Sequence, residues 1–169
     1  FSFEGSYRYE LMEEYYPELY NKMKEYIKTG RWNVCGSAFE NGDVNVPSPE
    51  ALFRNILYGN SYFNEKFGKR STDIFLPDCF GFGWALPSIA EHAGLKGFST
   101  QKLSWGSANG IPFDIGYWYG VNGKGVLVFC FYISVLSSRP KSNFNRFTTI
   151  AKVEHCNGTN TTNRVVCIV

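Results

Sequence analysis

The sequence predicts an α/β fold in which helices connect the strands of a parallel sheet. Short runs of β-branched and aromatic residues alternate with longer segments of helical periodicity, and this alternation is typical of crossover connections. Glycine or proline stands at most of the boundaries between these segments. A chain of 169 residues also suits one domain that buries a core of its own.

The first helical segment spans residues 7–29. Pro17 suits the first turn of a helix and predicts a fresh start there, while Gly30 provides the residue at which the segment ends. Three apolar residues recur at helical spacing and are expected to face the core: Leu19, Met23 and Ile27.

A strand and a second helix follow. In residues 31–37, Trp32, Val34 and Gly36 occupy every second position, which is the period of a strand. Ser48, Pro49 and Glu50 then start a helix that continues to about residue 68. Serine caps free N–H groups, proline fits the first turn, and glutamate faces the positive end of the helix dipole.

The alternation of strands and helices continues through the middle of the chain. Residues 73–77 and 96–101 predict strands, and residues 86–92 predict a helix between them. Residues 117–132 contain two apolar runs around the pair Asn122-Gly123, and Asn-Gly is a strong signal for the turn of a β-hairpin.

The composition excludes several classes of protein. A net charge of +2 predicts no particular affinity for nucleic acid or for a membrane surface. Five cysteines without a Cys-x-x-Cys pair argue against a disulfide framework and a closed structural zinc site. Aromatic residues make up 18% of the chain, which fits a Tyr- and Phe-rich core or a cleft whose rings stack on sugars. Composition alone favours the core.

The end of the predicted strand 73–77 carries the strongest candidate for chemistry. Asp78 follows Pro77 directly, and the carboxyl ends of strands are where α/β barrels carry out their chemistry. Cys79 is expected to pack inside, because adjacent side chains of an extended backbone point to opposite faces. On the local pattern alone, a helix cap or a turn explains Asp78 equally well.

The loop after the predicted strand 31–37 is also acidic. Glu40 and Asp43 lie there, on the edge of the sheet that carries Asp78, and Glu4 is a weaker member of the same set. Converging carboxylates suit carbohydrate chemistry, because glycosidic cleavage needs an acid and a base or nucleophile. A solvated loop is the plain alternative for Glu40 and Asp43.

Lys102 follows the predicted strand 96–101 and is therefore within reach of the same cleft. A lysine in that place would favour the ionised form of neighbouring carboxylates. An exposed lysine without a role at the cleft is the alternative.

Three motifs occur in a fixed order in the first three quarters of the chain. They are residues 47–54 (PSPEALFR), 76–81 (LPDCFG) and 97–105 (GFSTQKLSW). Together they resemble family 38 glycoside hydrolases, the retaining, zinc-dependent α-mannosidases. The resemblance implies that Asp78 is the catalytic nucleophile and also a zinc ligand. It further implies that three residues contact the substrate: Asp43, Phe80 and Lys102.

The resemblance covers residues 1–126, for which it implies a partial (β/α) barrel of the family 38 glycoside hydrolase/deacetylase type. Residues 127–169 do not follow the family pattern, and Glu154 is their only acidic residue. We therefore expect residues 127–169 to form an atypical tail that is out of frame or disordered. The family's His-x-Asp metal motif and its general acid are expected to lie outside this chain.

The leading hypothesis is a fragment of a retaining α-mannosidase that hydrolyses α-mannosidic bonds in oligosaccharides or glycans. Its cofactor would be one zinc ion whose other ligands lie outside the chain, so the isolated chain is expected to be inactive. The expected partner is a mannose-containing oligosaccharide, with no nucleic acid and no membrane. The alternatives are a non-catalytic carbohydrate-binding fragment and a related metal-dependent polysaccharide deacetylase; the lack of suitably placed histidines counts against the deacetylase.

Overall fold

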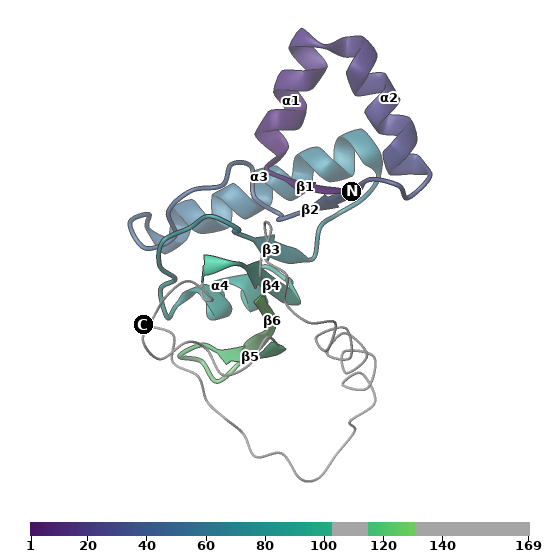
Figure 1. Ribbon diagram of the computed structural model, residues 1–169. Helices are drawn as coiled ribbons and strands as arrows, with labels where there is room; N and C mark the ends of the chain where they lie inside the picture. Colours follow the sequence, from purple (N-terminus) through teal and green to yellow (C-terminus); the bar gives the residue numbers. More distant parts are fainter. Residues whose placement is uncertain (103–114, 131–169) are drawn as a thin grey trace.

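The computed structural model describes residues 1–102 and 115–130, in which helices and strands alternate along the chain (Figure 1). The predicted α/β class is confirmed. The first part contains five elements: β1 (Ser2–Glu4), α1 (Ser6–Tyr15), α2 (Pro17–Lys28), β2 (Asn33–Cys35) and α3 (Pro49–Phe67). The second part contains five more: β3 (Asp73–Phe75), α4 (Leu86–His92), β4 (Gly97–Thr100), β5 (Ile115–Tyr119) and β6 (Gly125–Cys130).

The strands form two open sheets within the described residues. In the first, β1 pairs in parallel with β2. In the second, the order is β3-β4-β6-β5, and all neighbours are parallel except the β5–β6 hairpin. The Gly36 backbone N–H donates to Asp73 Oδ1 at 3.3 Å and so links the two sheets. The carboxyl ends of β1, β2 and β3 lie along one edge of the two sheets (Figure 1).

The strand β6 crosses the boundary that the sequence places after residue 126. Residues Leu127 to Cys130 of β6 pair in register with Gly97 to Thr100 of β4. Residues 127–130 are thus part of the sheet, and the remainder of the predicted tail, 131–169, lies outside the described residues.

The helix α3 begins and ends where the sequence predicts. The Ser48 hydroxyl accepts a hydrogen bond from the Ala51 N–H at 3.2 Å, and Gly68 closes the helix in the left-handed conformation. None of the helices in residues 1–102 and 115–130 is long and apolar enough to cross a membrane.

The helix α2 buries a different stripe from the one predicted. Met23 and Ile27 are buried as expected, but Leu19 is 56% exposed and Tyr20 is buried in its place. The helix restarts at Pro17, and its inner face then contains positions 20, 23 and 27. The Tyr20 hydroxyl lies 3.1 Å from that of Tyr62, so its polar end has a partner inside.

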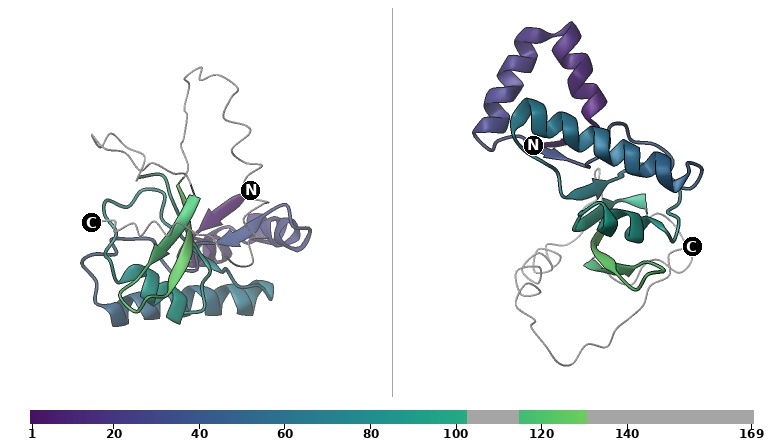
Figure 2. Two further views of the ribbon diagram at one scale, coloured as in Figure 1. Left: turned by 90° about the horizontal axis from the view of Figure 1, so that it is seen from below. Right: turned by 180° about the vertical axis from the view of Figure 1, so that it is seen from behind.

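Two hydrophobic clusters share one helix. Leu52 and Ile56 of α3 pack in the larger cluster with the second sheet and α4. Phe63, near the other end of α3, packs with Tyr9 of α1 and Met23 of α2 in the smaller cluster. Figure 2 shows α3 and α4 on the same face of the sheet. The helix α3 therefore fixes the α1–α2 pair relative to the strands.

Replacing Gly59 by alanine tests the closest approach in this packing. A Cβ at Gly59 would lie 2.2 Å from the Ser37 backbone oxygen and 2.3 Å from the Ala38 carbonyl carbon. We therefore expect Gly59→Ala to lower the free energy of unfolding by roughly 1–3 kcal/mol, although alanine normally favours a helix. Denaturant unfolding measures it. Ser61→Ala, at an exposed position of the same helix, is the control. A Gly59→Ala chain as stable as the wild type would contradict this packing.

Candidate functional site

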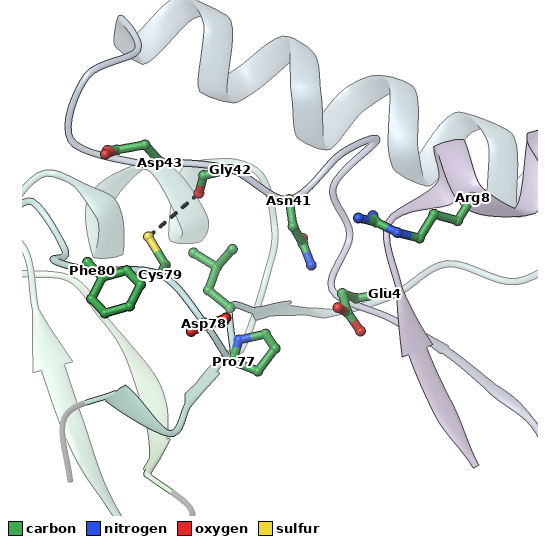
Figure 3. A pocket seen from close by; sticks show the side chains of 10 residues that line it. Glu4, Arg8, Asn41, Gly42, Asp43, Pro77, Asp78, Cys79 and Phe80 are labelled. Carbon is green, nitrogen blue, oxygen red and sulfur yellow. Dashed lines mark hydrogen bonds between the residues drawn. The ribbon is translucent and has the colours of Figure 1, made fainter. Parts of the chain in front are cut away.

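A pocket of about 370 Å³ lies at the carboxyl ends of β1, β2 and β3 (Figure 3). We refer to it as the strand-end pocket. Its lining comes from the last residue of β1, the first turn of α1 and the loops after β2 and β3: Glu4, Arg8, Asn41, Gly42, Asp43, Leu76, Pro77, Asp78, Cys79 and Phe80. Three of the four strand-end carboxylates predicted from the sequence line this pocket, namely Glu4, Asp43 and Asp78.

Asp78 lines the pocket from the loop after β3. Its side chain is 71% exposed, whereas that of Lys102, its partner, is only 8% exposed. Lys102 Nζ lies 2.6 Å from Asp78 Oδ1. Lys102 is therefore a largely buried side chain whose ammonium group pairs with the exposed carboxylate of Asp78. The sequence alternative of an exposed lysine is therefore wrong.

Phe80 stands at the rim of the same pocket. Its side chain is 75% exposed, and Lys102 Nζ lies 4.6 Å from the centre of its ring. An exposed ring beside a carboxylate offers a flat apolar surface, which is the shape that the face of a sugar ring requires.

Asp43 lines the pocket, but part of its carboxylate serves its own loop. Its Oδ1 accepts hydrogen bonds from the N–H groups of Asn45 at 2.6 Å and Val46 at 3.1 Å. Figure 3 shows the carboxylate turned away from Glu4 on the opposite wall. Asp43 therefore shapes the loop, and its contact with a substrate stays a prediction.

Of the two remaining acidic candidates, Glu4 lies in the strand-end pocket and Glu40 does not. Glu4, which the sequence ranks as the weaker one, lines the pocket at the end of β1. Glu40 is not among the lining residues. Its Oε1 accepts hydrogen bonds from Arg8 Nη1 at 2.5 Å and from the Asn41 N–H at 3.0 Å.

Arg8 and Asn41 also line the pocket, although neither was predicted from the sequence. Arg8 lies in the first turn of α1, four residues after Glu4, so it emerges at the same sheet edge. Asn41 directly follows Glu40 in the acidic loop. Their closeness in sequence to strand-end carboxylates is the signal that could have found them.

Cys79 packs inside, as predicted. It is 8% exposed, and its Sγ lies 3.6 Å from the Gly42 carbonyl oxygen and 3.5 Å from that of Gly81. Burial is the main cause that raises the pKa of the Cys79 thiol above its usual range. The thiol therefore links the loops after β2 and β3 and stays protonated at neutral pH.

The residues in the described part of the chain do not by themselves form a metal site. No three His, Cys, Asp or Glu side chains among them are grouped closely enough to hold an ion. Asp78 offers one carboxylate, and Lys102 binds one of its oxygens. A zinc ion needs about four ligands, so this set fits at most one of them.

A mixed α/β domain with carboxylates and an exposed aromatic ring around a strand-end pocket is the pattern of a carbohydrate-active enzyme. The sequence model of the glycosyl hydrolases family 38 N-terminal domain matches residues 2–168, and the chain belongs to this family. The match extends beyond residue 126, where the resemblance found in the sequence ends.

Two relatives and one solved structure illustrate the similarity. Alpha-mannosidase G of Dictyostelium discoideum is 42% identical over 119 residues, which are 70% of this chain and 11% of that protein. Human alpha-mannosidase 2C1 is 38% identical over 119 residues, again 70% of this chain and 11% of the relative. A glycosyl hydrolase family 38 structure from Enterococcus faecalis superposes with a TM-score of 0.56 at 19% identity, covering 86% of this chain and 16% of that one. The chain thus spans about a tenth of the length of the curated relatives.

Alkylation of Cys79 tests its packed state. Because burial raises the pKa of Cys79 above its ordinary value of 9.0 and that of Cys35 to about 12, both thiols hold less thiolate at pH 8 than free cysteine does. We expect iodoacetamide at pH 8 to modify the two cysteines at least about tenfold more slowly in the folded chain than in guanidinium. A cysteine introduced by Ser61→Cys on the exposed face of α3 is the fast-reacting control. Peptide mass spectrometry measures each site. Rapid labelling of Cys79 in the folded chain would show that it is open to solvent.

Proposed function

We propose that this chain forms part of the catalytic domain of a retaining α-mannosidase in which Asp78 is the nucleophile. The observation that carries the proposal is the position of Asp78 at the carboxyl end of β3, in a pocket that Glu4 and Asp43 also line. Membership of family 38 supports it, as do relatives named alpha-mannosidase. Because the chain corresponds to 11% of those relatives, the activity is that of a larger protein containing these residues.

Asp78 is suited to nucleophilic attack because its carboxylate is 71% exposed in the pocket. One carboxylate oxygen forms a bond to the anomeric carbon of mannose while the bond from that carbon to the leaving oxygen breaks. The leaving oxygen takes a proton from a general acid that we expect outside the described residues. Water then cleaves the bond between sugar and Asp78, and mannose leaves with its configuration retained.

The neighbours of Asp78 prepare the carboxylate and receive the sugar. Lys102 holds Asp78 in one orientation through the 2.6 Å contact, so that less freedom is lost on the way to reaction. Phe80, with its exposed ring, stacks on the sugar face. Asp43 binds a sugar hydroxyl with the part of its carboxylate that its own loop leaves available.

Asp78 is the one residue of this chain that we propose as a zinc ligand. Asp78 supplies one ligand, and the other ligands come from beyond the described residues. We likewise propose that the parallel strands are part of a (β/α) barrel of the type that family 38 shares with deacetylases. The 169-residue chain by itself is expected to be inactive on α-mannosides, because its described residues group no complete set of metal ligands and we expect the general acid outside them.

Asp78→Asn in the complete protein that carries this sequence tests the nucleophile. The substitution keeps the size of the side chain but removes its charge, so we expect kcat on an aryl α-mannoside to fall on the order of a thousandfold or more. Glu25→Gln, at an exposed position of α2, is the control and is expected to leave kcat unchanged.

The stereochemistry of the product gives a second readout. Proton NMR during the first minutes of hydrolysis is expected to show the α-anomer of mannose before mutarotation. Activity that survives Asp78→Asn, or a β-anomer as the first product, would refute the proposed mechanism.

A further inference from the structure

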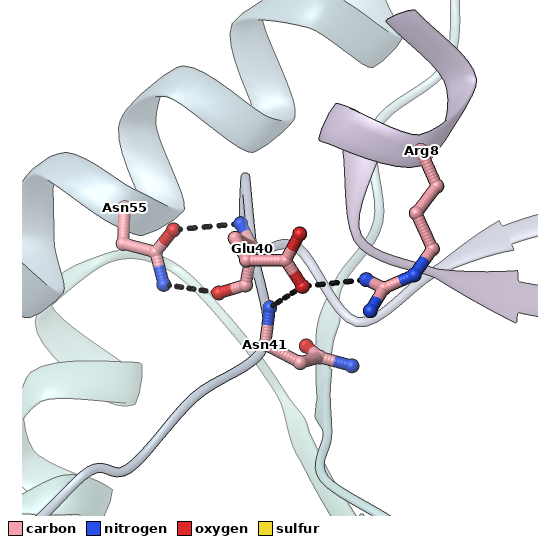
Figure 4. A network of polar contacts seen from close by, with 4 residues as sticks. All are labelled: Arg8, Glu40, Asn41 and Asn55. Carbon is pink, nitrogen blue, oxygen red and sulfur yellow. Dashed lines mark hydrogen bonds and ion pairs between the residues drawn. The ribbon is translucent and has the colours of Figure 1, made fainter. Parts of the chain in front are cut away.

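Polar contacts on two sides hold Glu40, the residue that precedes Asn41 in the loop (Figure 4). On one side, Glu40 Oε1 accepts the Asn41 N–H at 3.0 Å and Arg8 Nη1 at 2.5 Å. On the other side, Asn55 of α3 binds the Glu40 backbone twice, accepting from its N–H at 3.0 Å and donating to its carbonyl oxygen at 2.8 Å. The Glu40–Asn41 segment is thereby tied to α1 and to α3 at once.

The side chain of Asn41 has unused hydrogen-bonding capacity. Its Oδ1 is buried, and in the described part of the chain it has no hydrogen-bond partner. A buried carbonyl without a hydrogen-bond partner destabilises the fold, so natural proteins rarely keep one without a reason. A carboxamide also offers two donors. The hydrogen bond to Glu40 engages the backbone of Asn41 and not its carboxamide.

The carboxamide extends into the strand-end pocket. Asn41 is one of the lining residues, and Figure 3 shows its amide group directed into the space between Asp78 and Glu4. The last torsion of an Asn side chain is soft and roughly two-fold, so turning the amide about it exchanges the end that faces this space. A sugar whose anomeric carbon meets Asp78 would present its ring hydroxyls to Asn41.

The charges around Asn41 favour a neutral ligand over an anion. The positive charge of Arg8 is matched by Glu40 in their ion pair, and that of Lys102 by Asp78. Glu4 and Asp43 add negative charge to the lining. A hydroxyl group, which can donate and accept at once, suits this environment, whereas a carboxylate or phosphate would meet like charge.

We infer that Asn41 is a specificity-determining residue that binds a hydroxyl group of the sugar through its carboxamide, and that Glu40 is the positioning residue that holds it there. The inference rests on the proposed function, since it names the ligand of the same pocket. Glu40 thus acts through Asn41 and Arg8 and does not touch the sugar.

The first experiment observes the carboxamide directly in the 169-residue chain. The side-chain NH₂ signals of Asn41 are assigned in a ¹⁵N-labelled sample by their loss in Asn41→Ala. Methyl α-mannoside is then added to millimolar concentrations. We expect the Asn41 signals to shift and saturate, while those of Asn21, exposed on α2, stay in place. Asn41 signals that do not move while other pocket residues shift, or that move no more than those of Asn21, would overturn the inference.

The second experiment uses kinetics in the complete protein. Asn41→Ala is expected to lower kcat/KM for an aryl α-mannoside about tenfold or more. The same substitution should have almost no effect on the one deoxy-mannoside that lacks the contacted hydroxyl. Glu40→Ala should reproduce this pattern through KM, and Glu40→Gln, which keeps an acceptor for the Asn41 N–H, should restore part of it. Asn21→Ala is the control.

The outcomes separate this inference from the proposed function. Equal losses on the parent mannoside and on every deoxy-mannoside would show that Asn41 has only a structural role. A complete protein that cleaves no α-mannoside would refute the proposed function, while a saturable shift of the Asn41 amide in the isolated chain would still support sugar binding at Asn41.

Discussion

The packing of the loop after β2 against α3 is the constraint on which the site depends. The Ser37 and Ala38 backbone lies so close to Gly59 that a Cβ there would stand 2.2 Å from an oxygen. At the next residue of this loop, the Phe39 N–H donates to the Asn55 carbonyl oxygen of α3 at 2.8 Å. Because α3 also contributes residues to both hydrophobic clusters, its contacts with this loop fix the position of the loop at the carboxyl ends of the strands.

The site combines packed loops with two exposed side chains. Two features of the loops shape its walls: the Cys79 thiol lies 3.6 Å from the Gly42 carbonyl oxygen, and Gly81 has a φ of +117°, which side chains rarely adopt. On these loops, Asp78 and Phe80 remain largely exposed. Such a division is what binding and catalysis require, since the packed loops fix positions while the exposed groups meet the ligand.

Much of the fold could be predicted because local chemistry determines it. Pro17, the Ser48 cap and the Asn122-Gly123 turn mark boundaries that α2, α3 and the β5–β6 hairpin respect. The site was predicted less completely. That Asp78 meets Lys102, or that Glu40 turns to Arg8, thirty-two residues away, depends on contacts between distant segments. Side chains in irregular loops follow no period, so Glu40 and Asn41 could not be told apart from sequence.

The most direct test of the account is to trap the covalent intermediate on the complete protein that carries this sequence. A 5-fluoro-mannosyl fluoride slows the release of the sugar and leaves it attached to the nucleophile. Digestion and mass spectrometry then locate the label. We expect one 5-fluoro-mannosyl group, attached to Asp78. A label on Glu4, Asp43 or any other residue would contradict the central claim that Asp78 is the nucleophile.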